Sequence, residues 1–122
     1  MRSALLLCVS LVAMAMPLHG SDPLRISVSP AYSYAPSTLK VRLTVEPSAD
    51  NRAVEIIADS ADFYRSSEIN LDGDRAPPTF ELNFRHVPGG DYQVVAVLKD
   101  QAGRPRATAA RAVTVMAMGD HD

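Results

Sequence analysis

The chain has very little cysteine: Cys8 is the only one in 122 residues, and it lies in an apolar stretch near the N-terminus. A disulfide needs two cysteines, so a disulfide within the chain is excluded. The domain must therefore be held together by its hydrophobic core alone, although an oxidising compartment would permit a disulfide. The length suits one domain and leaves no room for a second one.

An excess of charge of one sign is also lacking. The 12 basic and 14 acidic residues give a formal net charge of −2, and removal of a leader that carries Arg2 would change it to −3. No basic field is present that would attract nucleic acid or anionic lipid, so nucleic acid is not expected as a partner. The arginines are dispersed along the chain, which predicts solvated strand faces and not a basic patch.

The sequence has few residues of the kinds that catalysis needs. Its histidines are His19, His86 and His121, and no Gly-x-Ser-x-Gly motif, phosphate-binding loop, dinucleotide-binding glycine set or zinc-ligand spacing is present. His86 follows a predicted strand beside a turn, where a partly exposed histidine is more typical than a catalytic one. The Asp-Gly-Asp segment 72–74 has turn composition but lacks the rest of a calcium-binding loop. We therefore expect a protein that is not an enzyme and has no cofactor.

Residues 1–20 have the pattern of a secretory signal peptide. Arg2 supplies the positive start, and the apolar stretch 4–16 is too short to span a bilayer as a stable anchor. Cleavage after Ala15 fits the small-x-small rule, and cleavage after Gly20 is the alternative. The sequence thus predicts export to the periplasm or the outside of the cell, with no membrane span left after cleavage.

The rest of the chain alternates apolar and polar residues with the period of two that is typical of half-buried strands. The clearest example is 39–46, in which leucine and valine alternate with charged and polar residues. Turn signals rich in Pro, Gly, Asp and Ser separate the runs, and no helical periodicity is present outside the leader. The extended runs are 24–29, 39–46, 54–58, 63–71, 80–85, 92–98 and 108–116.

Seven strands with turn signals about 8–12 residues apart predict an all-β fold, an immunoglobulin-like seven-stranded antiparallel sandwich. Two facing sheets would bury the alternating aliphatic residues, whereas a single sheet would leave one apolar face in water. The sandwich is expected to span 21–116, followed by a flexible tail, 117–122. Val95 and Val97 make the second face of their run apolar as well, which predicts a central strand or a surface that meets a partner.

The segment 88–94, Pro-Gly-Gly-Asp-Tyr-Gln-Val, resembles the Pro-Gly-x-x-Tyr-x-Val run of fibronectin type III and bacterial immunoglobulin-like domains. The resemblance implies structural roles for Pro88, Gly89, Gly90 and Tyr92. The tyrosine would form a corner, with its hydroxyl bonded to backbone a few residues upstream. The last valine of the segment stands where an antibody domain has its second cysteine. The chain has neither a tryptophan nor a cysteine pair, so an antibody-type domain is excluded.

Together these features predict an exported, non-enzymatic module for recognition of a protein or ligand, or for structural support. We expect its partner to be another protein or an extracellular ligand. The candidate binding residues are Tyr32, Tyr34 and Phe63, because they lie on predicted loops and aromatic rings anchor contacts. The alternative for these aromatic residues is that they seal the ends of the core.

Two other functions stay open at this point. Thioethers with an imidazole suit copper(I), so Met116, Met118 and His121 would form the metal site of a periplasmic copper-handling protein. In the other alternative, Tyr32 and Tyr34 would stack on sugar rings in a carbohydrate-binding accessory domain.

Overall fold

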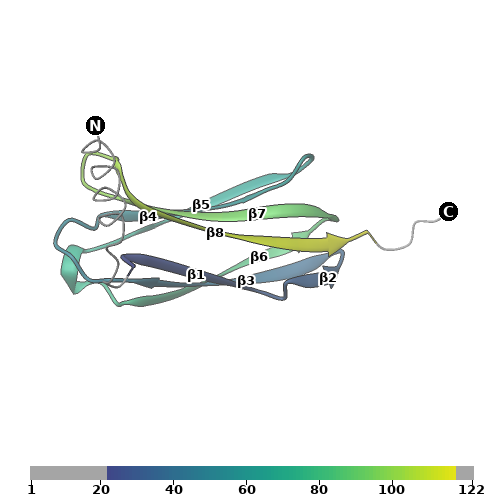
Figure 1. The fold of residues 1–122 in the computed structure, drawn as a ribbon, viewed down its shortest axis with the longest axis horizontal. Helices are drawn as coiled ribbons and strands as arrows, with labels where there is room; N and C mark the ends of the chain where they lie inside the picture. Colours follow the sequence, from purple (N-terminus) through teal and green to yellow (C-terminus); the bar gives the residue numbers. More distant parts are fainter. Residues whose placement is uncertain (1–21, 118–122) are drawn as a thin grey trace, which may run out of the picture.

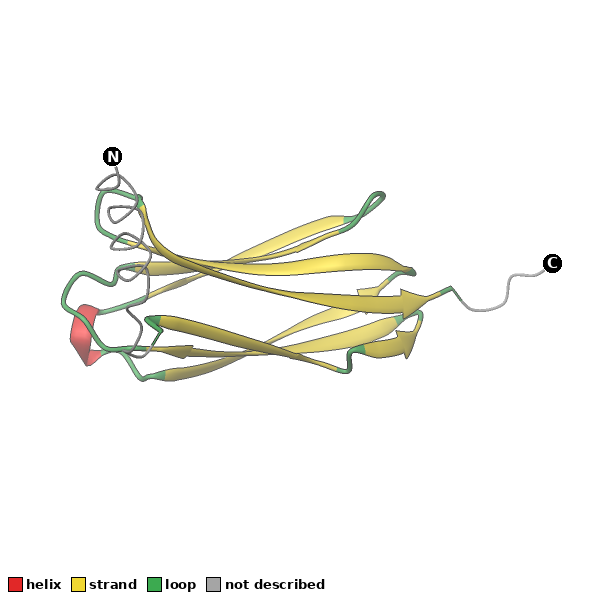
Figure 2. Ribbon diagram, viewed as in Figure 1, coloured by secondary structure: helices red, strands yellow, loops and turns green. Residues whose placement is uncertain are grey.

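The computed structural model describes residues 22–117, and over this range the protein is all-β. Figures 1 and 2 show long strands in two layers, joined by short loops. A single turn of 3-10 helix, η1 (Gly73–Arg75), lies in the connection that follows the fifth strand. The strands are β1 (Leu24–Ser29), β2 (Tyr32–Tyr34), β3 (Ser37–Val45), β4 (Ala53–Asp59), β5 (Tyr64–Asn70), β6 (Thr79–Val87), β7 (Gly90–Lys99) and β8 (Pro105–Met116).

The strands form two sheets. One sheet has the order β1-β3-β6, and the other has the order β2-β8-β7-β4-β5. In Figure 1 the layer that holds β1 and β3 faces the layer that holds β4, β7 and β8. The prediction of an all-β fold with two facing sheets is therefore confirmed.

The predicted number of strands was wrong, because the structure has eight strands and not seven. The additional strand is β2, in a segment whose composition predicted a loop. It is also the exception to the expected antiparallel arrangement, since it runs parallel to β8. Backbone bonds continue this pairing at both ends: the Thr114 amide donates to the Ala31 carbonyl at 2.9 Å, and the Ala35 amide donates to the Met116 carbonyl at 2.8 Å. A three-residue strand has no room for a period of two to emerge, so only its pairing partner reveals it.

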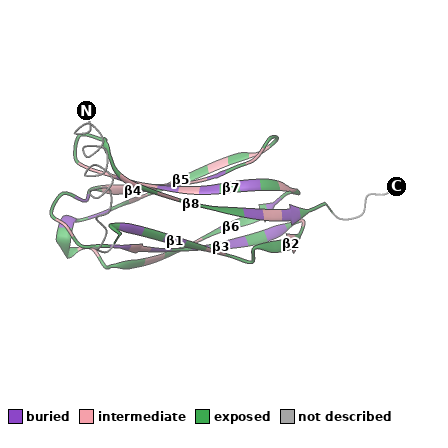
Figure 3. Cartoon of the chain, in the orientation of Figure 1, coloured by how far each residue is buried: buried purple, intermediate pink, exposed green. Residues whose placement is uncertain are grey.

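The core lies between the two sheets and follows the alternation of the sequence. In β3, every second residue from Ser37 to Val45 is buried, and the residues between them are exposed or half-buried. Figure 3 shows buried residues alternating with exposed or half-buried ones along β7. In β8 the buried residues are Val113 and Val115, near its end. The fully buried positions of β7 are Tyr92, Val94, Ala96 and Leu98, all at 1% exposure or less. These residues are the ones that the alternation placed inward.

The structure confirms that β7 is a central strand. It pairs with β4 on one side and with β8 on the other. Val95 and Val97 therefore lie on the outer face of the middle of the five-stranded sheet, where neighbouring strands partly cover them. Central position explains why this strand is apolar on both faces.

Several boundaries differ from the predicted ones by a few residues. Strand β5 begins at Tyr64, and β8 begins at Pro105, earlier than the predicted start at residue 108. The turn expected at 72–74 overlaps η1. Among the described residues, no helix is long and apolar enough to cross a membrane. The predicted signal peptide, 1–20, lies outside the described residues.

Candidate functional site

Tyr92 forms a corner at one end of the sandwich. Its side chain is 1% exposed, and its hydroxyl donates a 2.8 Å hydrogen bond to the carbonyl of Pro88. This is the kind of bond that the resemblance implies. Burial of the phenol raises the pKa of Tyr92 above its ordinary value near 10. The hydrogen bond thus ties the first residues of β7 to the turn that precedes the strand.

The two glycines of this turn lie close to other backbone and side chains. A Cβ added at Gly89 would lie 3.0 Å from the backbone of Ala117, and one added at Gly90 would lie 3.3 Å from the hydroxyl of Ser60. Larger residues at either position would push against the end of β8 or against the β4–β5 hairpin. The glycines therefore permit three chain segments to meet beside Tyr92.

Phe63 belongs to the same corner. Its ring meets the ring of Tyr92 edge to face, with 5.9 Å between the ring centroids, and the guanidinium of Arg65 lies 4.9 Å above it. Arg65 also donates to the backbone carbonyl of Arg85 at 2.6 Å. Phe63 is half-buried in this arrangement, so its ring serves to seal the end of the core.

Tyr32 and Tyr34 are placed differently. Both lie on the edge strand β2, and their side chains are 70% and 62% exposed. Ser33 between them is half-buried, with its hydroxyl 2.8 Å from the hydroxyl of Ser37, so the two tyrosines share the opposite, outer face. Met116 pairs with Tyr34 on the neighbouring strand and is 42% exposed. We call Tyr32, Tyr34 and Met116 the tyrosine edge.

A third exposed tyrosine, Tyr64, was not among the predicted binding residues. Tyr64 is 61% exposed at the start of β5, the strand at the opposite edge of the same sheet. The sequence contained a signal for the exposure of Tyr64. Ile69 was expected to point inward, and because side chains alternate along a strand, the even-numbered residues of that run, Tyr64 among them, must point outward. The tyrosines of β2 and β5 are separated by the full width of the sheet.

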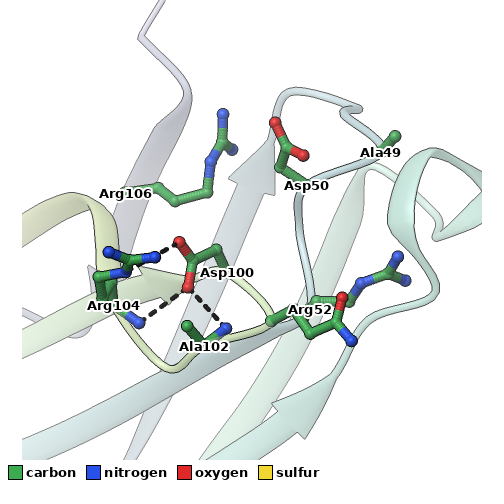
Figure 4. Close-up of a pocket in the computed structure, with 8 residues that line it drawn as sticks. Ala49, Asp50, Arg52, Asp100, Ala102, Arg104 and Arg106 are labelled. Atoms are coloured by element: carbon green, nitrogen blue, oxygen red, sulfur yellow. Dashed lines mark hydrogen bonds and ion pairs between the residues drawn. The ribbon is translucent and has the colours of Figure 1, made fainter.

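A pocket opens at the other end of the sandwich, between the β3–β4 and β7–β8 loops. Its volume is about 520 Å³. Figure 4 shows Arg104 and Arg106 on one side, Asp50 and Arg52 on the other, and Asp100 between them. We call it the arginine groove. Its lining residues are Ala49, Asp50, Arg52, Asp100, Gln101, Ala102, Arg104 and Arg106.

Asp100 holds the β7–β8 loop in shape. Its Oδ1 accepts hydrogen bonds of 2.9 Å from the amides of Ala102 and Arg104, and its Oδ2 lies 3.8 Å from Nε of Arg104. The bond from the Arg104 amide is the largest cause of a lowered pKa at Asp100. This carboxylate is therefore committed to its own loop.

Asn51 lies between the groove residues Asp50 and Arg52 in the sequence and holds the side chain of Arg106. It is 1% exposed, its amide nitrogen donates to the carbonyl of Glu46 at 2.9 Å, and its Oδ1 accepts from the guanidinium of Arg106. The backbone of Asn51 also accepts from the Gly73 amide at 3.1 Å. A buried amide with all these partners fixes the loop and the arginine that rests on it.

This groove was not predicted, because Arg52 is far along the chain from Arg104 and Arg106. A weaker signal existed, since they flank two predicted turns, 48–51 and 100–105. Alternating strand directions bring those turns to one end of the sandwich. The spacing of the arginines along the sequence therefore did not show that three of them line one pocket.

The residues of the copper hypothesis lie only partly within the described range. Met116 ends β8, whereas Met118 and His121 lie outside the described residues, as does most of the tail 117–122. His86 is exposed, at a backbone φ of 56°, where β6 has an irregular register against β3. Within residues 22–117 no group of three or more His, Cys, Asp or Glu side chains has the spacing of a metal site.

No protein-family model and no curated protein matches the chain. Among solved structures, the chain is similar to the sulfur carrier protein SoxY from Chlorobium limicola f thiosulfatophilum, with 14% sequence identity and a TM-score of 0.49. The alignment covers 93% of this chain and 96% of that one. Likeness at this level carries no conclusion about function, which must come from the chain's own residues.

Proposed function

We propose that the protein is an exported, non-enzymatic recognition module that binds another protein through the tyrosine edge. The observation that carries the proposal is the exposure of Tyr32 and Tyr34, at 70% and 62%, on one face of an edge strand. Tyrosines present a large, rigid area at little cost in conformational entropy and are enriched in binding hot spots. The neighbouring Met116 extends the apolar area and adapts to different shapes.

The environment of the tyrosine edge supports a contact site over a merely structural role. Phe63, Tyr92 and Val87 already close this end of the core, so the β2 rings are not required to seal it. Thr114 and Asp91, joined by a 3.2 Å hydrogen bond, lie next to Tyr32 on β8 and β7. An apolar centre with a polar border is the usual composition of a protein-binding patch.

Within this proposal, we assign the sandwich to the immunoglobulin-like class with fibronectin type III character. The three-stranded sheet β1-β3-β6 corresponds to strands A, B and E, and β4, β7 and β8 correspond to C, F and G. The corner tyrosine then falls near the start of the strand equivalent to F. Export is supported by the leader pattern of residues 1–20.

The test compares capture of partners from the exported protein fraction of the producing cell. Immobilised mature protein, the double variant Tyr32→Ala/Tyr34→Ala and the control Tyr64→Ala are used side by side. We expect one retained protein to be lost with the double variant and kept with the control, which removes an equally exposed tyrosine at the other edge. Equal retention by all three forms would rule out the tyrosine edge as the binding site.

The carbohydrate hypothesis uses the same two rings, Tyr32 and Tyr34. It differs from the protein-binding proposal in the ligand, which would be a polysaccharide. Retention on an insoluble polysaccharide that depends on Tyr32 and Tyr34, with no protein captured, would replace the protein-binding proposal by the carbohydrate-binding one.

A further inference from the structure

The arginine groove lies at the end of the sandwich opposite the tyrosine edge, and nothing in the proposed function uses it. Its volume of about 520 Å³ is in the range of pockets that hold small molecules. Three arginines face two aspartates along its walls, which leaves one positive charge in excess. The groove is therefore polar and cationic in a protein whose overall charge is negative.

Of the three groove arginines, only Arg104 has a carboxylate partner among the described residues. Asp100 is held by two backbone amides of its own loop and lies 3.8 Å from Arg104. Within residues 22–117, neither Arg52 nor Arg106 forms an ion pair with a carboxylate. Both guanidiniums have five N–H donors and therefore retain donors for a ligand.

The positions of these two arginines are set by buried structure. Arg106 donates to Oδ1 of Asn51, which is itself 1% exposed. The backbone of Arg52 is bonded on both sides, its amide to the Lys99 carbonyl and its carbonyl to the Leu71 amide, each at 2.9 Å. The backbone bonds fix where the Arg52 side chain starts, and the Asn51 bond holds the Arg106 side chain itself, so Arg106 loses less conformational entropy when a ligand binds.

We infer that the arginine groove binds a small molecule that carries an oxoanion, either a carboxylate or a tetrahedral phosphate or sulfate group. Arg52 and Arg106 supply forked N–H donors, which match the oxygen pairs of these groups. Gln101 offers an amide to the rest of the ligand. Asp50 repels additional negative charge from the same space, so a ligand with a single anionic group fits best.

The test is an NMR titration of the mature protein, at low ionic strength, with acetate, inorganic phosphate and sulfate in separate arms. We expect saturable shifts confined to the amides of 49–52, 100–104 and 106, and the arm with the tightest binding identifies the type of oxoanion. Arg52→Gln and Arg106→Gln should each weaken that binding about tenfold, the effect of losing one charge-assisted contact. Asp50→Asn should strengthen the binding of phosphate, because it removes a repelling charge.

The control is Arg85→Gln, which makes the same change in net charge at the opposite end of the sandwich. Its binding should equal that of the unmodified protein. Equal weakening by Arg85→Gln and by the groove variants, or the absence of saturable shifts in all three arms, would overturn the inference. The amide spectrum of each variant shows whether the variant is folded. If Arg106→Gln unfolds because it loses the hydrogen bond to Asn51, the result for Arg52→Gln decides the test. Because the tyrosine edge is untouched by these variants, failure here leaves the proposed function standing.

Discussion

Tyr92 is the residue at which three parts of the chain come together: the Pro88 turn, the β4–β5 hairpin and the first residues of β7. The resemblance of 88–94 to a known motif implied a bond from the hydroxyl to backbone a few residues upstream, and in the structure the acceptor is the Pro88 carbonyl. The contact with Phe63 could not be predicted, because it depends on which hairpin reaches this end of the sandwich. The hydrogen bond within the motif could thus be expected for Tyr92, whereas its contacts with residues distant in sequence could not.

Replacing Tyr92 by Phe keeps the ring packing and removes the hydroxyl bond to Pro88. We expect the free energy of unfolding to fall by about 1 kcal/mol, the usual net worth of a hydrogen bond of this type. Urea denaturation followed by circular dichroism measures it. Tyr64→Phe is the control, because its exposed ring should change the stability by less than about 0.5 kcal/mol. An equal change in the free energy of unfolding for the two variants would mean that the bond from Tyr92 to Pro88 does not stabilise the fold.

Stability should also fall at alkaline pH. Burial raises the pKa of Tyr92 in the folded state, so the folded protein holds this proton more tightly than the unfolded chain does. The resulting stabilisation is fully present below the ordinary tyrosine pKa near 10 and is lost as pH rises through the higher folded value. Lys99, whose pKa its hydrogen bond with Glu55 raises, adds a loss in the same direction.

The comparison that isolates the tyrosine is the pH dependence of Tyr92→Phe. Urea denaturation at several pH values above neutral should show a smaller alkaline loss for this variant than for the unmodified protein. Identical alkaline losses would mean that the phenol of Tyr92 does not ionise with an altered pKa.

At the scale of elements, prediction succeeded for long strands and failed for a short one. Strands β3 and β7 run for nine and ten residues, and their alternation identified the buried side chains correctly. Strand β2 has three residues, and its parallel pairing with β8 depends on contacts with residues about eighty positions later. The central position of β7 was one of two alternatives that Val95 and Val97 suggested by making both faces apolar, the other being a surface that meets a partner.

The two faces of β7 should differ sharply in their contribution to stability. Leu98 is 0% exposed in the core, so Leu98→Ala should lower the free energy of unfolding by about 2–5 kcal/mol. Val97→Ala, on the half-buried outer face, should cost no more than about 1 kcal/mol. Chemical denaturation of both variants measures the difference. Similar losses would indicate that the outer face is as deeply buried as the core, for example by a bound partner or second copy.

For the whole molecule, the two ends of the sandwich carry different chemistry. The end with the Tyr92 corner bears the tyrosine edge, and the other end bears the arginine groove. The tyrosines were candidates from the sequence alone, because aromatic residues on a predicted loop are conspicuous. The groove was not, because Arg52 and Arg106 line one pocket only when two loops meet.

Processing by the producing cell tests the export part of the proposal. We expect the intact mass of the protein recovered from the exported fraction to correspond to cleavage after Ala15 or Gly20, the two sites that the leader pattern offers. A full-length mass, with the protein retained in the cytoplasm, would contradict export.

The most direct measurement of the central claim is photo-crosslinking in the exporting cell. A photoreactive phenylalanine analogue replaces Tyr32 in one variant, and Ser66, an exposed position on the edge strand β5, in another. Our account predicts one discrete crosslinked protein from position 32 and none from position 66. Crosslinks of equal strength and identity from both positions, or none from position 32, would contradict recognition through the tyrosine edge.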